Sequence, residues 1–343
     1  MINYNKNKKK EKCLRRKMNS DICGDANNHT NKAYEKGMQD DDSYGGNGKV
    51  QILMSTYNGE EYIREQLDSI LAQSYPDVDI LIRDDGSSDD TFVILKEYEE
   101  LHQNIRAYQG ENLGVNRSFF ELLRESNTEA AYIGFCDQDD YWLPEKIEKA
   151  AGQLKRMKGP ALYCGAKTLV DENLEPLKAQ QNSHIKPGFG NAVIESICSG
   201  CTALMNRELA DIIRKRLPED VIHHDWWCYM AAAYLGSIYY DENSYIYYRQ
   251  HKGNEVGASG STLGMIKAKA RDLKKRHGDL KKQLLDFKRF YHTKPDKDKL
   301  VDAILGAEKF PDRLTILFDH RWYRQNTLDN WVVRGLFLLN RML

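Results

Sequence analysis

Three carboxylates crowd into the sequence FCDQDDYW at residues 135–142. Asp137, Asp139 and Asp140 follow directly on an apolar run that has the length of a buried strand. Because like charges this close repel one another, a positive group is needed among them. Asp137 and Asp139 have the spacing that lets two carboxylates reach one divalent cation, and oxygen ligands point to Mg²⁺ or Mn²⁺. We therefore predict a cation site completed by water and by phosphate oxygens of a bound nucleotide.

Two other polar clusters, STYNG at 55–59 and RDDGSSDD at 83–90, also follow apolar runs. The periodicity predicts strands at 50–54, 78–82, 105–109 and 131–135, and helices at 60–73, 89–101, 115–125 and 226–235. Ser88 or Asp89 is placed to cap the helix at 89–101. Alternation of this kind predicts an α/β fold, with a mostly parallel sheet covered by helices on both faces. Ligands of such sheets collect beyond the carboxyl ends of the strands, so the three clusters should meet at one rim.

The composition sets limits on the partners. The 343 residues are 41% hydrophobic and carry a formal net charge of −1, which gives no general attraction to nucleic acid. Neither GxxxxGK[ST] nor GxGxxG follows the first strand, so a diphosphate would be held mainly by metal. The missing glycine-rich phosphate loop also argues against a sugar nucleotidyltransferase, a class of enzyme that likewise has metal-binding acids on an α/β sheet. The alternative to an enzyme is a sugar-binding subunit that catalyses no reaction.

Seven cysteines, an odd number scattered along the chain, are typical of free thiols in a reducing compartment. Cys198 and Cys201 form a single CxxC, which we interpret as ordinary packing, with zinc or redox chemistry as the alternative. No apolar stretch has the length of a spanning helix, and the N-terminus lacks a signal-peptide core. We expect a cytoplasmic protein.

The runs STYNGEEYIREQL, RDDGSSDDT, NLGVNRSFFELL and GFCDQDDYWLPEKIE occur in this order and closely resemble glycosyltransferase family 2, over about residues 49–251. The resemblance implies the GT-A fold and inverting, metal-dependent transfer from a nucleotide sugar. It implies that the nucleotide is held by Thr56, Tyr57, Asn58, Asp84 or its neighbour Asp85, Arg117 and Asp137. It also implies that the metal, Mn²⁺ or Mg²⁺, is held by Asp137 and Asp139, with Asp139 as the direct ligand.

The motif HHDWW places Asp225 at the start of a predicted helix, where an acid is a cap by default. The resemblance implies instead that Asp225 is the general base, although His224 stands where the family usually has Glu. In the later motif YYRQH, the resemblance implies that Arg249 and His251 approach the diphosphate or the metal, with a structural histidine as the alternative.

The segment from Gly200 to Arg207 resembles the acceptor side of the family site, which also includes Trp226. The alternative is that Asn206 and Arg207 simply begin a helix. Among members of the family, the motifs are most similar to bacterial rhamnosyltransferases that use dTDP-L-rhamnose in cell-surface polysaccharide synthesis. This implies a saccharide acceptor, commonly lipid-linked, while UDP-hexose donors remain the alternative.

The predicted domains are a disordered polar leader at 1–48, a catalytic domain at 49–255, and a helical region at 256–343. The catalytic domain has a nucleotide-binding half, 49–142, and an acceptor half, 143–255. Residues 267–289 read as a basic amphipathic helix or helix pair, and 331–343 carry Trp, Leu and Phe among Arg. A solvated helix face is one interpretation. Attachment to anionic lipid on the inner face of the plasma membrane is the other.

Overall fold

The structure, a computed structural model, describes residues 48–177, 184–219, 221–251 and 278–342. The predicted leader at 1–48 lies outside the described residues except for Gly48, and so does the first part of the basic segment, 267–277.

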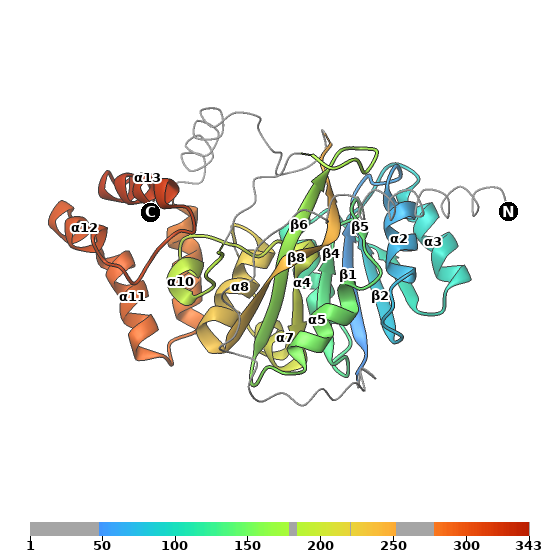
Figure 1. Cartoon of the computed structure of the whole chain (residues 1–343), viewed down its shortest axis with the longest axis horizontal. Helices are drawn as coiled ribbons and strands as arrows, with labels where there is room; N and C mark the ends of the chain where they lie inside the picture. The colour runs from blue at the N-terminus through green and yellow to red at the C-terminus, as the bar shows by residue number, and fades with distance from the viewer. Residues whose placement is uncertain (1–47, 178–183, 220, 252–277, 343) are drawn as a thin grey trace, which may run out of the picture. The chain divides into compact units, whose positions relative to one another are not determined.

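An eight-stranded mixed sheet forms the centre of the fold, in the order β3-β2-β1-β4-β7-β6-β8-β5 (Figure 1). The strands are β1 (Val50–Thr56), β2 (Val78–Asp84), β3 (Ile105–Gln109), β4 (Tyr132–Cys136), β5 (Tyr141–Trp142), β6 (Ala161–Val170), β7 (Leu204–Asn206) and β8 (Ser237–Arg249). The first four neighbours in this order are parallel, as predicted. Strand β7 runs antiparallel to both β4 and β6, whereas β6 and β8 are parallel. The carboxyl ends of β1, β2, β4, β6 and β8 therefore lie along one rim of the sheet.

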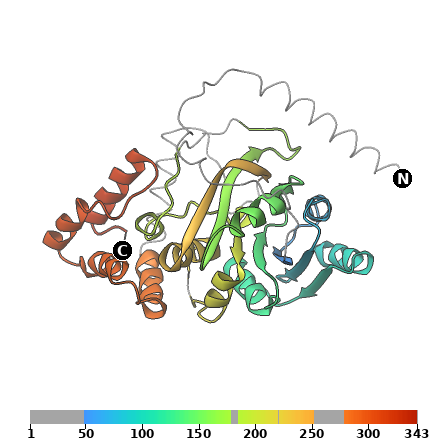
Figure 2. The same ribbon diagram turned by 60° about the horizontal axis from the view of Figure 1, so that its bottom comes forward.

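Helices cover both faces of the sheet, as the alternating pattern predicts (Figure 2). They are α2 (Ile63–Leu71), α3 (Thr91–Leu101), α4 (Val115–Glu125), α5 (Lys146–Leu154), α6 (Phe189–Ala192), α7 (Arg207–Arg214) and α8 (His224–Leu235). Leu53 and Leu81 pack with residues of α4, α7 and α8 in one core. Ile52 and Ile80 point the opposite way and pack with α2, α3 and α5. Successive strand residues thus serve opposite cores, because strand side chains alternate between faces.

Within the described residues 278–342, the chain forms α10 (Asp279–Phe290), α11 (Pro295–Gly306), α12 (Phe310–Leu317) and α13 (Thr327–Leu338). Helix α10 packs against α8, where the ring of Phe287 meets those of Trp227 and Tyr234 at centroid distances of 5.5 Å. Leu280, Leu284 and Phe287 are at most 6% exposed, because they belong to the core that includes α8. These three apolar residues of α10 therefore face the protein core, which contradicts the lipid interpretation for them, whereas Leu285 of the same helix is exposed.

Candidate active site

The loops that follow β1, β2 and β4 meet at the predicted rim. The backbone N–H of Asp85 donates to the Thr56 carbonyl at 2.7 Å, joining the first two loops. The side chain of Gln138, within the acidic cluster, accepts from Tyr57 N at 2.8 Å and donates to Tyr57 O at 3.0 Å. This reciprocal amide pair joins the acidic loop to the loop after β1. The sequence analysis missed the role of Gln138, because only the carboxylates on either side of it were interpreted as functional.

Gly59 makes room for the Gln138 side chain. A Cβ atom at Gly59 would lie 2.3 Å from Gln138 Oε1, which is inside any allowed contact. Gly59 also donates its N–H to Thr91 Oγ1 at 2.8 Å, so the same loop is tied to the start of α3. Asn58, predicted to bind the nucleotide, has a positive φ of 47° and accepts from Ser88 N at 2.8 Å. Side-chain and backbone bonds thus fix the shape of this loop.

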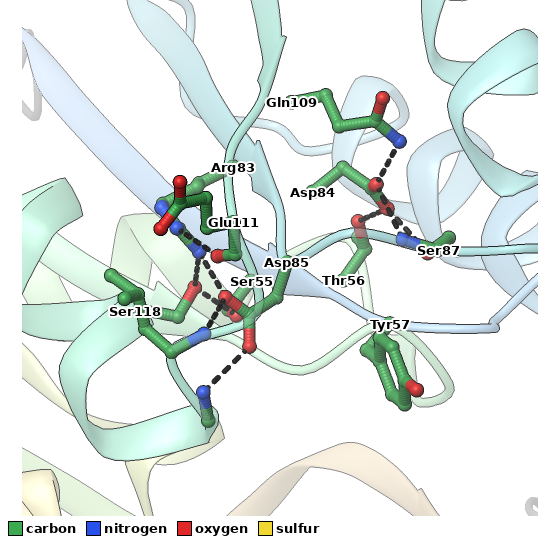
Figure 3. A network of polar contacts seen from close by, with 12 residues as sticks. Ser55, Thr56, Tyr57, Arg83, Asp84, Asp85, Ser87, Gln109, Glu111 and Ser118 are labelled. Carbon is green, nitrogen blue, oxygen red and sulfur yellow. Dashed lines mark hydrogen bonds and ion pairs between the residues drawn. The ribbon is translucent and has the colours of Figure 1, made fainter.

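The two neighbouring acids at the end of β2 are both bound by protein groups (Figure 3). Asp84 is fully buried and accepts from Thr56 Oγ1 at 3.0 Å, from Gln109 Nε2 at 2.9 Å, and from both Ser87 N and Ser87 Oγ. Four acceptances fill the usual capacity of a carboxylate. Asp84 therefore holds the rim together, while its predicted contact to a nucleotide stays a prediction.

Asp85 forms a buried ion pair with Arg83, and both side chains are 4% exposed. It also accepts from Leu113 N and Gly114 N at 2.8 Å, which fixes the turn before α4 (Figure 3). Arg83 continues the network to the Glu111 carbonyl at 2.7 Å. With three acceptances, Asp85 retains more hydrogen-bonding capacity for a ligand than Asp84 does.

Two other residues predicted to bind the nucleotide are exposed at the rim. Half of the Tyr57 side chain is accessible, and its ring lies beside the network without taking part in it (Figure 3). Arg117 is exposed on the first turn of α4 and has no hydrogen bond or ion pair within the described part of the chain. An exposed aromatic ring and an unpaired guanidinium are groups that can stack on a base and contact phosphate.

The three acids of the sequence DQDD, residues 137–140, have different surroundings after β4. Asp137 lies among Asp140 and Cys201, with one ligand atom of each within 4.8 Å of the others. Asp139 turns to His251, whose Nε2 lies 2.8 Å from Asp139 Oδ2. Asp140 is fully buried beneath the loop, where its Oδ1 accepts from Arg249 N at 3.2 Å. The predicted residues Asp137, Asp139 and His251 thus share one region, but Asp139 rather than Asp137 contacts the histidine.

Burial and repulsion act on these carboxylates. Burial, with repulsion from Asp139 and Asp225, raises the pKa of Asp137 to about 7, and Lys167 opposes the rise. Burial also raises the pKa of Asp140 well above its usual range, with Asp137 and Asp139 adding to the effect. Burial is the first cause of both shifts and repulsion the second, and positive charge placed among these carboxylates would oppose both.

Two lysine side chains supply part of that charge, Lys167 from outside the predicted motifs and Lys146 from the run that contains the acidic cluster. Lys167, on β6, donates to Ser199 Oγ at 3.0 Å, and its Nζ lies 3.8 Å from the centre of the Tyr248 ring. Lys146 Nζ lies 3.3 Å from the centre of the Trp142 ring, and burial lowers the pKa of Lys146 to about 8. Lys167 could not be found from the sequence, because its place at the rim depends on the position of β6 in the sheet.

Arg249, predicted to approach the diphosphate, is 2% exposed and lies under the acidic loop. Its guanidinium donates to the Asp139 carbonyl at 2.9 Å, to the Glu172 carbonyl at 2.5 Å and to Glu65 at 2.5 Å. The guanidinium also lies over the ring of Tyr62, with 4.7 Å between the guanidinium carbon and the ring centroid. The arginine therefore fixes the backbone of the acidic loop, and its contact with a diphosphate stays a prediction.

Asp225 lies at the start of α8, as predicted. Its Oδ2 accepts from Gly200 N at 2.8 Å and its Oδ1 from Trp226 N at 2.6 Å. Each carboxylate oxygen thus has one backbone donor and can accept a second hydrogen bond. Gly200 and Trp226, predicted on the acceptor side, both adjoin this carboxylate, and Trp226 Nε1 is bound to the Ala192 carbonyl at 2.6 Å.

His224, which precedes this acid, is a buried imidazole stacked on Phe119 at a centroid distance of 4.1 Å. Its Nε2 is buried with no hydrogen-bond partner among the described residues. Burial lowers the pKa of His224 to about 4. The position that the family usually fills with Glu is thus occupied by an uncharged ring at neutral pH.

Asn206 lies elsewhere. It pairs with Tyr132 at the amino end of β4, opposite the rim, so the prediction that it contacts the acceptor is wrong. Its Oδ1 accepts from Leu209 N at 3.1 Å and caps α7, which begins at Arg207. The alternative interpretation, that these two residues begin a helix, is confirmed.

The CxxC does not form a disulfide, since Cys198 and Cys201 are both buried free thiols. The Cys198 thiol bonds the Ser199 carbonyl at 3.8 Å, whereas Cys201 faces Asp137 and Asp140. One cysteine thus packs in the core and the other joins the acidic cluster.

Comparisons with known proteins agree with this arrangement. The family model described as Glycosyl transferase family 2 matches residues 51–213. The dTDP-rhamnosyl transferase RfbG of Shigella flexneri is 33% identical over 241 residues, which cover 63% of this chain and 80% of that protein. The putative teichuronic acid biosynthesis glycosyltransferase TuaG of Bacillus subtilis is 29% identical over 160 residues, covering 46% of this chain and 62% of that protein.

Two solved structures share the fold. S. aureus TarS 1-349 in complex with UDP-GlcNAc has a TM-score of 0.57 at 16% identity, covering 86% of this chain and 82% of that one. The mannosyltransferase PcManGT from Pyrobaculum calidifontis in complex with GDP-Man and Mn²⁺ has a TM-score of 0.50 at 14% identity, covering 86% of each chain. The GT-A fold, the family model and the bacterial relative lead to one conclusion: this chain belongs to glycosyltransferase family 2.

Proposed function

We propose that the enzyme transfers L-rhamnose from dTDP-L-rhamnose to a saccharide acceptor, with inversion, in the synthesis of a cell-surface glycan. The observation that carries the chemistry is the position of Asp225, whose carboxylate is held by Gly200 N and Trp226 N near the acidic loop. The choice of donor is supported by the 33% identity to a dTDP-rhamnosyl transferase over 80% of that protein.

The acidic cluster fits the divalent cation that the family implies. The carboxylate oxygens among its donors are the ligands that Mg²⁺ and Mn²⁺ prefer, and Oδ2 of Asp140 is buried without a hydrogen-bond partner in the described structure. We propose that Asp137 and Asp139 hold Mn²⁺ or Mg²⁺, with His251 beside Asp139. When bound, the cation would offset the charge that grows on the departing diphosphate.

Side chains of this protein carry out the proton transfer and bind the donor. Asp225 takes the proton of the acceptor hydroxyl as that oxygen attacks the anomeric carbon, and the bond to the diphosphate breaks. Two backbone N–H groups fix the base, so its orientation does not depend on substrate. On the donor side, Tyr57 offers an exposed ring for the base and Arg117 an exposed guanidinium for the phosphates.

Replacing Asp225 with Asn tests the base. The variant keeps the shape of the side chain and should lose about 10²–10⁴-fold in transfer rate, the usual contribution of a general base. Donor binding should persist, because the base contacts the acceptor. A folded variant that binds donor and transfers sugar at the normal rate would refute the assignment.

The donor can be identified by thermal shift. Each nucleotide sugar is added with Mn²⁺, and a true ligand at 100 times its dissociation constant stabilises the folded state by about 2.7 kcal/mol. We expect a response to dTDP-L-rhamnose. A response to a UDP-hexose alone would retain the glycosyltransferase and reject rhamnose.

We also propose that α12 and α13 attach the enzyme to the membrane that carries a lipid-linked acceptor. Among the described residues, every helix is too short or too polar to cross a bilayer. One stripe of α13 nevertheless exposes Leu328, Trp331 and Val332 at helical spacing, with Leu339 just after the helix, and Trp331 is 56% exposed. Exposed tryptophan and leucine on one side of a helix are typical of interfacial segments.

Substitution is a cleaner test of this attachment than truncation, because α10 shares a core with α8. Trp331→Ser combined with Leu328→Ser should reduce binding to anionic vesicles in a flotation assay. The matched control is Val333→Ala, which changes a buried residue of the same helix and should leave vesicle binding in place. Equal binding by the double variant and the unmodified protein would contradict the proposal.

A further inference from the structure

A buried thiol belongs to the acidic cluster that the sequence interpretation assigned to oxygen ligands alone. One ligand atom from each of Asp137, Asp140 and Cys201 lies within 4.8 Å of the other two. Cys201 is 1% exposed and Asp140 is fully buried, whereas Asp137 is only partly buried and lies at the rim. An ion would therefore reach the thiol by passing Asp137.

The second observation is the unmet hydrogen-bonding capacity of Asp140. Its Oδ1 accepts from Arg249 N at 3.2 Å, but the buried Oδ2 has no partner among the residues that the structure describes. A buried carboxylate oxygen without a donor is costly. A cation between Asp140 and Cys201 would remove that cost.

We propose that Cys201, Asp140 and Asp137 form a second kind of cation site in this enzyme, selective for thiophilic divalent ions such as Zn²⁺ and Cd²⁺. Sulfur favours these ions, while Mg²⁺ and Mn²⁺ favour an all-oxygen set. Binding converts the Cys201 thiol to a metal-bound thiolate and releases its proton to solvent. Three protein ligands leave a fourth position of a tetrahedral ion for water.

This site shares Asp137 with the pair proposed to hold Mn²⁺ or Mg²⁺. The same carboxylate cannot serve both ions in full, so zinc would oppose the cation used in transfer. That consequence rests on the proposed function, whereas the binding of Zn²⁺ or Cd²⁺ does not. The competing explanation is that two lysines supply the counter-charge without an ion, Lys146 to Asp140 and Cys201, and Lys167 to Cys201 and Asp137.

Cadmium titration of the full chain tests the proposal, because a Cd–thiolate bond has an ultraviolet charge-transfer band. We expect the band in the unmodified protein. In Cys201→Ser, the band should disappear. The Cd²⁺ affinity measured by calorimetry should also fall, by more than the factor of about 10–100 that is typical when a metal site loses a group outside its direct ligands. The matched control is Cys198→Ser, which removes the other buried thiol of the CxxC and should keep the band.

Asp140→Asn provides a second route if the serine variant does not fold, since it should weaken Cd²⁺ binding while retaining Cys201. No band in the unmodified protein, or a band lost in Cys198→Ser but kept in Cys201→Ser, would overturn the site. Transfer is measured separately with Mn²⁺ and added Zn²⁺. A band without any transfer activity would leave the site intact and count against the proposed function alone.

Discussion

The buried imidazole of His224 should make the enzyme lose stability in mild acid. Burial lowers the pKa of His224 from 6.5 to about 4, while the unfolded chain keeps the ordinary value. As the pH falls below 6.5, the unfolded state takes up a proton that the folded state refuses, so the free energy of unfolding decreases. The loss continues until the pH reaches about 4, where the folded state also binds the proton.

The magnitude follows from the two pKa values. Their separation corresponds to about 3 kcal/mol in total, of which about 2 kcal/mol should be lost between about pH 7 and about pH 5. Other acids titrate in the same window, so the comparison is with His224→Gln, which cannot take up this proton. We expect that the unmodified protein loses about 2 kcal/mol more than the variant over this window.

Urea unfolding at both pH values measures the difference. Tryptophan fluorescence follows the transition, and far-ultraviolet circular dichroism checks that the variant is folded at neutral pH. Parallel loss of stability in both proteins would refute the reasoning, since it would mean that His224 is not held neutral. Steeper loss in the variant would refute it as well.

Two further predictions concern the loops of the donor side. Arg83→Met should lower the free energy of unfolding by about 3–5 kcal/mol, because it leaves the Asp85 carboxylate buried and unpaired. Urea unfolding measures this loss. A loss below about 1 kcal/mol would show that water reaches the carboxylate. Gly59→Ala should cost about 1–3 kcal/mol by forcing the Gln138 side chain away. The cost should largely disappear in a Gln138→Ala background, and additive losses would argue against this contact.

Local patterns predicted the nucleotide-binding half of the fold well. The strand at Ile105–Gln109 and the helix at Val115–Glu125 have the predicted bounds. Strand β1 continues past the apolar run through Ser55 and Thr56, because these polar residues are satisfied by hydrogen bonds within the rim. Hydrophobic periodicity cannot detect a polar residue buried in this way. The helix predicted to be capped by Ser88 or Asp89 begins at Thr91, so Asp90 occupies the N-cap position, while Asp89 Oδ1 accepts from Thr91 N at 3.0 Å.

The other half was less predictable, because its strands are neighbours only in space. Strand β7 has three residues, and its antiparallel pairing places Cys201 beside the acidic loop and Asn206 at the far end. Lys167 reaches the rim because β6 pairs with β8 over a long register, which no local motif encodes. Asp137 was singled out from residue type and spacing, and Asp225 from the family resemblance, but the surroundings of both acids depend on this pairing.

The packing of α10 on α8 explains why α8 lacks a polar side. Trp227 and Tyr234 are at most 1% exposed, since Phe287 and Tyr291 cover them. Without that cover, the helix that begins with His224 and Asp225 would present large aromatic rings to water, which favours aggregation. Bulky aromatic residues at these two positions should therefore mark relatives that possess the same C-terminal cover, and smaller or polar residues should mark relatives that lack it. The presence of this cover in a relative can thus be inferred from two positions in its catalytic domain.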